Sequence, residues 1–242
     1  MNVQEATTRR LPDLKERHLP ENCRETINTI LKETYGYEQF RNLEIYDDLS
    51  KGKEKLCISQ GQLIENVILE AEKAWKGETQ VDNILLTAPT GSGKSLLFQL
   101  PAIYLGKEYN LLTIVVSPLK ALIVDQVESL QELGYTRVAY ASSDLSPEQK
   151  MEVYRQVREG EIDLFYLSPE LLLSYDIKHF VGERRIGLVV VDEAHTVTTW
   201  GKEFRVDYWF LGRYLNTLKQ TLGYNFPLFA LTATAVWNPK GQ

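Results

Sequence analysis

The sequence contains little cysteine, no long hydrophobic run and no excess of positive charge. Only two of its 242 residues are cysteines, Cys23 and Cys57, and neither has a C-x-x-C partner. We therefore predict neither a disulfide framework nor a zinc site. The longest strongly apolar stretch, residues 111–124, contains Pro118 and Lys120 and is too short to span a lipid bilayer. No membrane partner is expected.

The net charge of −6 argues against a chain held on nucleic acid by overall basicity, although it leaves room for a local basic or polar track. The first 20 residues are polar and charged and lack the apolar core of a signal peptide. We therefore expect a cytoplasmic protein, or a nuclear one in a eukaryote. With 43% hydrophobic and 25% charged residues, the chain has the composition of a globular protein with a substantial core.

A glycine-containing loop follows a short apolar run in the first half of the chain. Residues 87–95 read Thr-Ala-Pro-Thr-Gly-Ser-Gly-Lys-Ser, between the apolar residues 84–86 and 96–98. This order predicts a strand, a phosphate-binding loop and a helix, with Lys94 on the phosphates and Ser95 on Mg²⁺. The predicted loop residues are Thr90, Gly91, Ser92, Gly93, Lys94 and Ser95. The usual pattern has glycine where Ala88 stands.

The rest of the chain alternates β-rich runs with amphipathic stretches, which predicts a parallel sheet with helices on both sides. Runs such as Leu188-Val189-Val190-Val191 are apolar without alternation, as in a strand buried on both faces. Predicted strands span residues 112–117, 137–141, 164–167, 187–191 and 228–231. Predicted helices span residues 25–35, 62–75, 96–105, 119–133, 147–158, 169–179 and 208–222. Residues 42–58 are expected to be an irregular or partly helical insertion.

Two acids follow the apolar run that ends at Val191. Asp192 and Glu193 are predicted at the carboxyl end of a buried strand, where open α/β sheets bind their ligands. An aspartate on Mg²⁺ beside a glutamate that orients water suits phosphoryl transfer to water. Taken alone, the pair would favour a strand end capped by two solvated acids. Together with Lys94 and Ser95, it predicts ATP hydrolysis with Mg²⁺.

These segments resemble the first RecA-like lobe of superfamily-2 helicases of the DEAH type. Residues 88–95 and Asp192-Glu-Ala-His195 match the two nucleotide motifs, and the aromatic-rich segment 200–205, Trp-Gly-Lys-Glu-Phe-Arg, narrows the resemblance to RecQ-like helicases. In this family Ala88 fits the loop. Further matches are residues 117–122 to motif Ia, 168–170 to motif Ib and 231–235 to motif III. Thr199 and Lys202 depart from the usual glutamine and histidine.

The resemblance implies an adenine site formed by an aromatic residue, an arginine and a glutamine. Tyr37 and Arg41 match the first two, but Glu44 stands where the glutamine is expected, three residues after the arginine. A carboxylate does not offer adenine the donor and acceptor of a carboxamide. We therefore predict that Gln62 reads adenine after an insertion. The alternative is that Gln62 simply starts a helix.

The resemblance also implies contacts with a single DNA strand and residues that couple them to hydrolysis. Ser117 and Ser168 are predicted to contact the DNA strand. Because serine before proline also suits a helix N-cap, the alternative for both is that they cap helices. Stacking and cation–π contacts suit bases of any identity, although Phe204 could equally pack in the core. The predicted residues are Ser117, Lys120, Ser168, Trp200, Phe204, Arg205, His195, Thr232 and Thr234.

The resemblance implies the following division of the chain. Residues 1–24 are expected to be a flexible lead-in, 25–80 a helical adenine-recognition extension that includes the insertion, 81–237 the RecA-like lobe and 238–242 a tail. A helicase core needs a second lobe with an arginine on the γ-phosphate, which we expect in cis or in trans. The chain is therefore expected to be a fragment or one half of a split system, and to hydrolyse ATP slowly by itself.

The predicted function is the ATP-binding lobe of a RecQ-like DNA helicase, which couples ATP hydrolysis to translocation on DNA or unwinding of it. One alternative is another superfamily-2 DNA translocase or remodeller, for example in defence against foreign DNA. A second is an ATP-gated nucleic-acid scaffold that does not unwind. A kinase or a GTPase would not explain the segment at 200–205.

Overall fold

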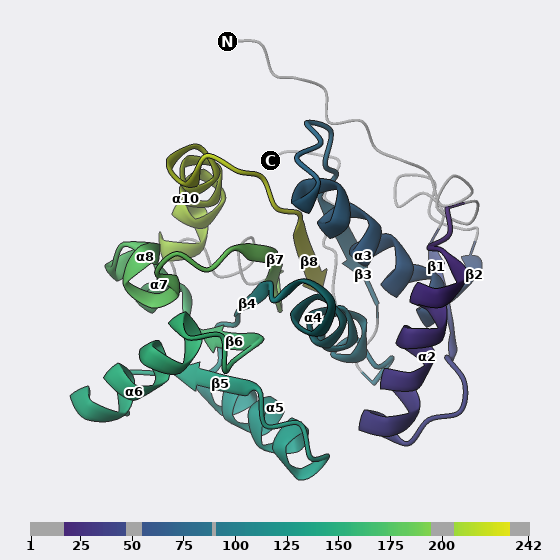
Figure 1. The fold of residues 1–242 in the computed structure, drawn as a ribbon, viewed down its shortest axis with the longest axis horizontal. Helices are drawn as coiled ribbons and strands as arrows, with labels where there is room; N and C mark the ends of the chain where they lie inside the picture. Colours follow the sequence, from purple (N-terminus) through teal and green to yellow (C-terminus); the bar gives the residue numbers. More distant parts are fainter. Residues whose placement is uncertain (1–16, 47–54, 89–90, 195–205, 233–242) are drawn as a thin grey trace, which may run out of the picture.

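A six-stranded parallel sheet forms the centre of the protein (Figure 1). The computed structural model describes residues 17–46, 55–88, 91–194 and 206–232. The strand order is β3-β8-β7-β4-β6-β5, and every pairing is parallel. The strands are β3 (Ile84–Thr87), β4 (Leu112–Val116), β5 (Val138–Ala141), β6 (Leu164–Leu167), β7 (Ile186–Val191) and β8 (Leu228–Thr232). The predicted α/β fold is confirmed.

Helices cover both faces of this sheet (Figure 1). On one face lie α3 (Gln60–Trp75), α4 (Leu96–Tyr109) and α5 (Lys120–Glu132), with α2 (Glu21–Tyr35) packed against α4. The other face carries α6 (Pro147–Arg158), α7 (Pro169–Ser174), α8 (Ile177–Val181) and α10 (Val206–Leu222). None of the described helices is long and apolar enough to cross a lipid bilayer.

The unbroken apolar run of β7 has a direct structural explanation. Leu188 and Val190 pack in the cluster under α3, α4 and α5, whereas Val189 and Val191 pack in the cluster under the opposite helices. Successive side chains of a strand point to opposite faces, so a strand covered on both sides needs apolar residues at every position.

Residues 42–59 differ from the sequence prediction. We expected an irregular or partly helical insertion, but β1 (Asn42–Tyr46) and β2 (Lys55–Ser59) form an antiparallel pair. Leu43 lies opposite Ile58 in this pair, and both side chains are buried. Cross-strand apolar pairs of this kind stabilise a two-stranded unit. The pairing also brings the two ends of the insertion together, since the Gln60 N–H donates to the Arg41 carbonyl at 2.9 Å.

Two helix boundaries also differ from the prediction. The first helix begins at Glu21 directly after Pro20, so residues 21–24 are helical and do not belong to a flexible lead-in. The single helix predicted over 169–179 is divided into α7 and α8 by Tyr175, whose backbone is extended. Asp176 then caps α8 by accepting the Lys178 N–H at 2.9 Å. An aspartate that caps a new helix competes with continuation of the old one.

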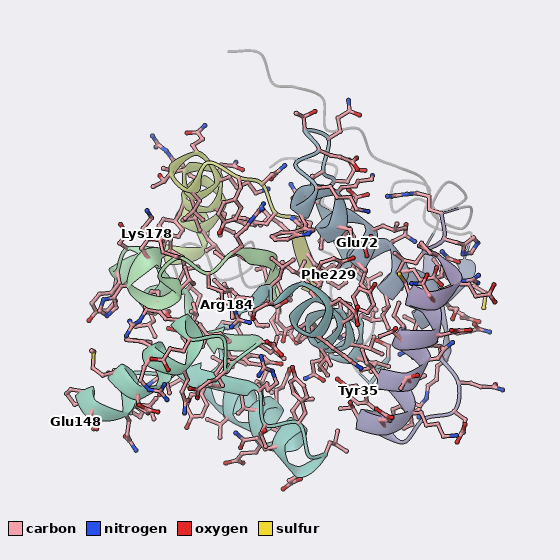
Figure 2. All side chains as sticks on the ribbon, in the orientation of Figure 1. Tyr35, Glu72, Glu148, Lys178, Arg184 and Phe229 are labelled. Carbon is pink, nitrogen blue, oxygen red and sulfur yellow. The ribbon has the colours of Figure 1, made fainter. Side chains whose placement is uncertain are left out.

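A buried ion cluster fixes the start of β6. The Asp163 carboxylate accepts hydrogen bonds from Arg184 at 2.9 Å, from Arg137 Nε at 2.6 Å and from the Tyr135 hydroxyl at 2.9 Å. Arg184 lies inside the fold, and its side chain is 4% exposed (Figure 2). The side chain of Asp163 also lies against Gly106 of α4, at a place where a β-carbon would collide with it. This cluster therefore joins β5, β6, α4 and the segment before β7.

Candidate nucleotide-binding site

The phosphate loop lies between β3 and α4, as the sequence predicts. Gly91 and Gly93 have φ angles of 80° and 78°, in the left-handed region that glycine adopts at little cost. Ser95 directly precedes the first turn of α4 with helical backbone angles. The N–H groups at the start of a helix and a loop of this shape together favour an anion. The Lys94 ammonium donates to the Ala88 carbonyl at 3.0 Å, so it lies folded over the loop.

The two predicted acids lie at the carboxyl end of β7. Asp192 is only 5% exposed, and its Oδ1 accepts the Glu193 N–H at 2.9 Å. Burial raises the pKa of the Asp192 carboxyl, as does the Glu193 charge, while the Glu193 N–H and the Lys94 charge act in the opposite direction. Glu193 has a φ of 50°, which is rare for a residue with a side chain. Strained backbone of this kind concentrates at functional sites.

Backbone hydrogen bonds join the loop and the acids through β8. The Ala88 N–H donates to the Thr232 carbonyl at 3.0 Å, and the Ala194 N–H donates to the Leu231 carbonyl at 2.8 Å. The end of β8 therefore lies between the phosphate loop and the two acids.

The residues of this site fit a phosphate-bound Mg²⁺ ion. A buried carboxylate with a raised pKa lacks charge compensation that a divalent cation would supply. Hydroxyl and carboxylate oxygens, such as those of Ser95 and Asp192, are the hard ligands that Mg²⁺ prefers. The Ser92 hydroxyl is buried in the loop and has no hydrogen-bond partner among the described residues. A ligand at the loop would give this hydroxyl a partner.

The predicted aromatic and arginine of the adenine site lie next to each other. The Arg41 guanidinium lies 5.8 Å from the centre of the Tyr37 ring, and Tyr37 is 48% exposed. The Tyr35 ring stacks on Tyr37, with 6.4 Å between the ring centres and 15° between the planes. The exposed ring and the guanidinium are therefore available to a flat ligand.

The structure brings Gln60 to the loop, not the predicted Gln62. Gln60 is 2% exposed; its carboxamide oxygen accepts the Arg41 N–H at 3.1 Å, and its nitrogen donates to the Ser92 carbonyl at 3.1 Å. The Gln62 side chain donates instead to the Arg17 carbonyl at 2.8 Å. Residues two apart on a helix do not share a face, so only one of the two can turn toward the loop. Gln60 was not predicted from the sequence; the signal for it was its place directly after the N-cap Ser59.

A buried hydrogen-bond network connects the adenine side of the site to Asp192. The Tyr35 hydroxyl on α2, labelled in Figure 2, donates to the Gln99 oxygen at 3.3 Å. The Gln99 nitrogen donates to the Tyr166 hydroxyl at 3.2 Å, and this hydroxyl donates to the Gln126 oxygen at 3.1 Å. A hydrogen bond from Gln126 in turn lowers the pKa of Asp192, against the effect of burial. The chain of hydrogen bonds that ends at this carboxylate therefore passes through side chains of four elements.

The predicted DNA contacts have different surroundings. Ser117 is 2% exposed and its hydroxyl has no partner within the described chain, so it does not lie on the surface where we expected it. It does not cap α5 either, because the cap position is Leu119. Lys120 is exposed and bonds Ser143 and Asp144, the latter at 2.9 Å. Ser168 caps α7 by accepting the Leu171 N–H at 3.3 Å.

The remaining predicted residues divide into two groups. Thr232 is described; it lies at the end of β8, is 4% exposed, and its carbonyl is the group that bonds Ala88. The others lie outside the described residues: Thr90, His195, Trp200, Phe204, Arg205 and Thr234. Their predicted roles stay predictions.

A parallel sheet with a glycine loop at one strand end and an acid pair two strands away defines a RecA-like nucleotide-binding lobe. The family model for DEAD/DEAH box helicases matches residues 63–240. The chain therefore belongs to the DEAD/DEAH box helicase family, and the resemblance to the first lobe of RecQ-like helicases is confirmed.

Curated relatives include the ATP-dependent DNA helicases RecQ of Synechocystis sp. and Haemophilus influenzae. They are 34% and 31% identical to this chain, over 88% and 87% of it. The chain spans only 38% and 28% of their lengths. A crystal structure of the DUF1998 helicase MrfA bound to DNA has a TM-score of 0.59 and 20% identity, and it matches 91% of this chain and 28% of the other. That likeness supports the fold.

Proposed function

We propose that this lobe binds ATP with Mg²⁺ and couples its hydrolysis to movement along DNA or to DNA unwinding. The observation that carries the proposal is the junction at β8, where one strand bonds both the loop with Lys94 and the segment with Asp192 and Glu193. An ATPase needs both halves at one place, because the phosphates and the attacking water must meet.

Each residue has a defined part in this proposal. Lys94 and the loop N–H groups bind the phosphates, and Ser95 and Asp192 hold Mg²⁺. The ion, when bound, neutralises charge on the phosphate oxygens. Glu193 orients the attacking water, and its backbone strain is consistent with a fixed position. No residue has to form a covalent intermediate.

Adenine would bind at the exposed Tyr37 ring, beside Arg41. We propose that Gln60, rather than Gln62, pairs with the adenine edge, because its carboxamide keeps a second N–H and a second lone pair beyond its bonds to Ser92 and Arg41. Its contacts with Arg41 and Ser92 join the base site to the phosphate loop. Residues 25–80 would thus form an adenine-recognition extension of the lobe at 81–237.

DNA is the proposed nucleic acid because the RecQ relatives are DNA helicases and the MrfA structure contains DNA. The chain spans about a third of those relatives, and we propose that a second RecA-like lobe supplies an arginine to the γ-phosphate. An arginine finger is worth roughly 10³–10⁵ in rate, so the lobe alone is expected to bind ATP and to hydrolyse it slowly.

The test compares two substitutions in the site with one outside it. We expect Lys94→Ala to lose binding of a fluorescent ATP analogue, and Glu193→Gln to keep binding while losing hydrolysis. The control is Glu183→Gln, an exposed acid on the segment before β7. Equal hydrolysis by Glu193→Gln and the unmodified protein would refute the assignment and would favour an ATP-gated scaffold. Strand displacement by the full-length protein separates unwinding from translocation alone.

A further inference from the structure

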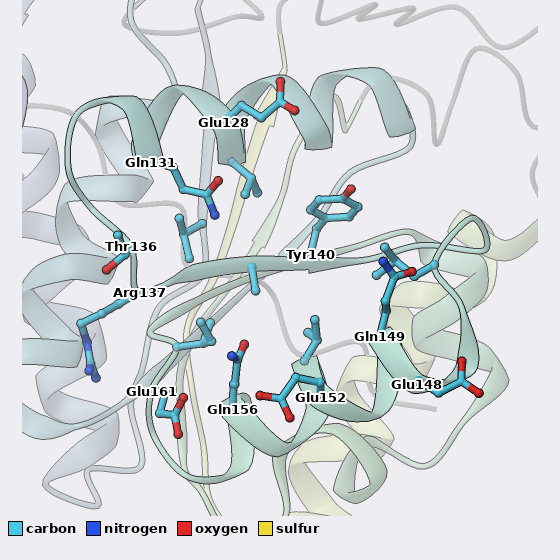
Figure 3. A pocket seen from close by; sticks show the side chains of 16 residues that line it. Glu128, Gln131, Thr136, Arg137, Tyr140, Glu148, Gln149, Glu152, Gln156 and Glu161 are labelled. Carbon is cyan, nitrogen blue, oxygen red and sulfur yellow. The ribbon is translucent and has the colours of Figure 1, made fainter.

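The edge strand β5 lies at the base of a groove between α5 and α6 (Figure 3). The groove has a volume of about 970 Å³. Figure 3 shows Gln131 on α5 and Gln156 on α6 pointing toward the strand from opposite sides. This surface lies away from the phosphate loop, at the opposite edge of the sheet from β3. Nothing in the proposed ATPase reaction uses it.

The strand at the base of the groove has a free hydrogen-bonding edge. Among the described strands, β5 pairs only with β6. The Arg137 carbonyl accepts the N–H groups of Asp163 and Leu164, so residues 137, 139 and 141 turn their backbone groups toward β6. Because these groups alternate in direction, the N–H and C=O of Val138 and Tyr140 point into the groove. Both residues line it.

This edge has little protection against added strands beyond its short length of four residues. Proteins also block exposed edges with lysine, proline, a bulge or a covering helix. The sequence of β5 is Val-Ala-Tyr-Ala, and its register with β6 runs without a shift. The helices α5 and α6 flank the edge and leave the groove open between them. An extended segment can therefore enter.

The charges of the groove specify what kind of segment it fits. The acids that line it are Glu128, Glu148, Glu152 and Glu161. The one cation among the lining residues, Arg137, is bound to the buried Asp163. Arg155, beside the groove, pairs with Glu152 and Glu161 and offsets part of the negative charge. An acidic groove repels nucleic acid, anionic lipid and a second copy of this chain, whose net charge is −6. It attracts a basic partner.

We propose that a basic, extended peptide segment of a partner protein binds here as an added strand beside β5. Its backbone would pair with Val138 and Tyr140, in the mode known as β-augmentation. Its side chains would alternate between the two walls, so lysines or arginines at alternate positions would meet Glu128 on α5 or Glu152 on α6. The carboxamides of Gln131 and Gln156 would complete polar contacts at both sides.

The experiment uses a labelled eight-residue peptide that alternates valine with lysine. We expect saturable binding to the protein, and slower hydrogen exchange at the Val138 and Tyr140 amides when peptide is bound. Two control peptides separate the causes: one carries N-methyl groups at alternate backbone nitrogens, and the other has glutamate in place of lysine. Neither is expected to bind measurably. Binding of the N-methylated peptide, or unchanged amide exchange, would overturn strand addition.

Charge reversal on the protein gives the matched test. The double variant Glu128→Lys, Glu152→Lys is expected to bind the lysine peptide about tenfold more weakly at low salt. Its control is the double variant Glu132→Lys, Glu159→Lys, which reverses two charges on α5 and directly after α6. The control is matched because Glu152 and Glu159 both pair with Arg155, so each double variant breaks one of these ion pairs. Equal loss in both double variants would refute a specific groove. Tighter binding of the glutamate peptide or of single-stranded DNA there would also refute it.

Discussion

Replacing Gln60 by alanine tests how the base site and the phosphate loop are joined. The substitution removes the acceptor of the Arg41 N–H and the donor to the Ser92 carbonyl, both at 3.1 Å in a buried position. Each hydrogen bond contributes about 1 kcal/mol, so the two contribute about 2 kcal/mol. If that free energy maintains the binding-competent loop, ATP affinity should fall roughly 30-fold. Loss of the pairing with adenine would add to this.

The assay is titration of the purified chain with ATP and with GTP, with Mg²⁺ present. Adenine offers a donor and an acceptor at the edge where guanine offers two acceptors, so a carboxamide discriminates between them. We expect Gln60→Ala to weaken the binding of both nucleotides through the loop, and to weaken ATP binding further because the pairing with adenine is also lost. Gln62→Ala is the matched control on the same helix, because its side chain contacts the Arg17 carbonyl instead. It should change ATP affinity less than about threefold, in line with a substitution outside the site.

Three outcomes are informative. Loss of ATP binding in Gln62→Ala, with Gln60→Ala unaffected, would refute our reasoning and restore the sequence prediction. Equal loss of ATP and GTP in Gln60→Ala would mean that Gln60 only positions the loop. Unfolding of Gln60→Ala is checked by circular dichroism; in that case Gln60→Glu, which keeps the size but loses the donor to Ser92, gives the comparison.

Four further predictions concern stability and metal binding. Asp163→Ala leaves the buried Arg184 without its carboxylate partner and should lower the free energy of unfolding in urea by about 3–5 kcal/mol, whereas the exposed Glu38→Ala should cost at most about 1 kcal/mol. Gly106→Ala forces a methyl group against Asp163 and should cost about 1–3 kcal/mol in the same assay. Gln126→Leu should weaken ATP binding with Mg²⁺ more than without it, and an equal loss in both would indicate a general packing defect. Glu70, although buried, has a lowered pKa because a backbone N–H and two cations bond its carboxylate. Its contribution to folding stability is therefore present above its unfolded pKa and is lost as the pH falls through its folded pKa. We expect Glu70→Gln to flatten the acid limb of the curve of stability against pH.

The sequence predicted the sheet, the loop and the acid pair because each depends on local pattern. Apolar runs without alternation require burial on both faces, and β7 satisfies this through two separate clusters. The hairpin of β1 and β2 was not predicted, because its buried apolar pair, Leu43 and Ile58, joins residues that are far apart in the sequence. Gln62 was predicted where the structure places Gln60 for a similar reason. Which of them meets Ser92 depends on how the hairpin orients α3.

Two sets of hydrogen bonds lead from the proposed adenine site to the two halves of the phosphate site. Gln60 connects the Arg41 backbone to the phosphate loop, and the network that begins at Tyr35 connects the neighbour of Tyr37 to the acid that would hold Mg²⁺. A base that orders Tyr37 would therefore act on both halves of the site, because each connection consists of hydrogen bonds between buried or partly buried groups. A nucleotide with the wrong base would bind its phosphates at the same loop but would leave these two connections unchanged. Discrimination between bases would then appear in the positioning of Mg²⁺ and water, and so in hydrolysis, as well as in affinity.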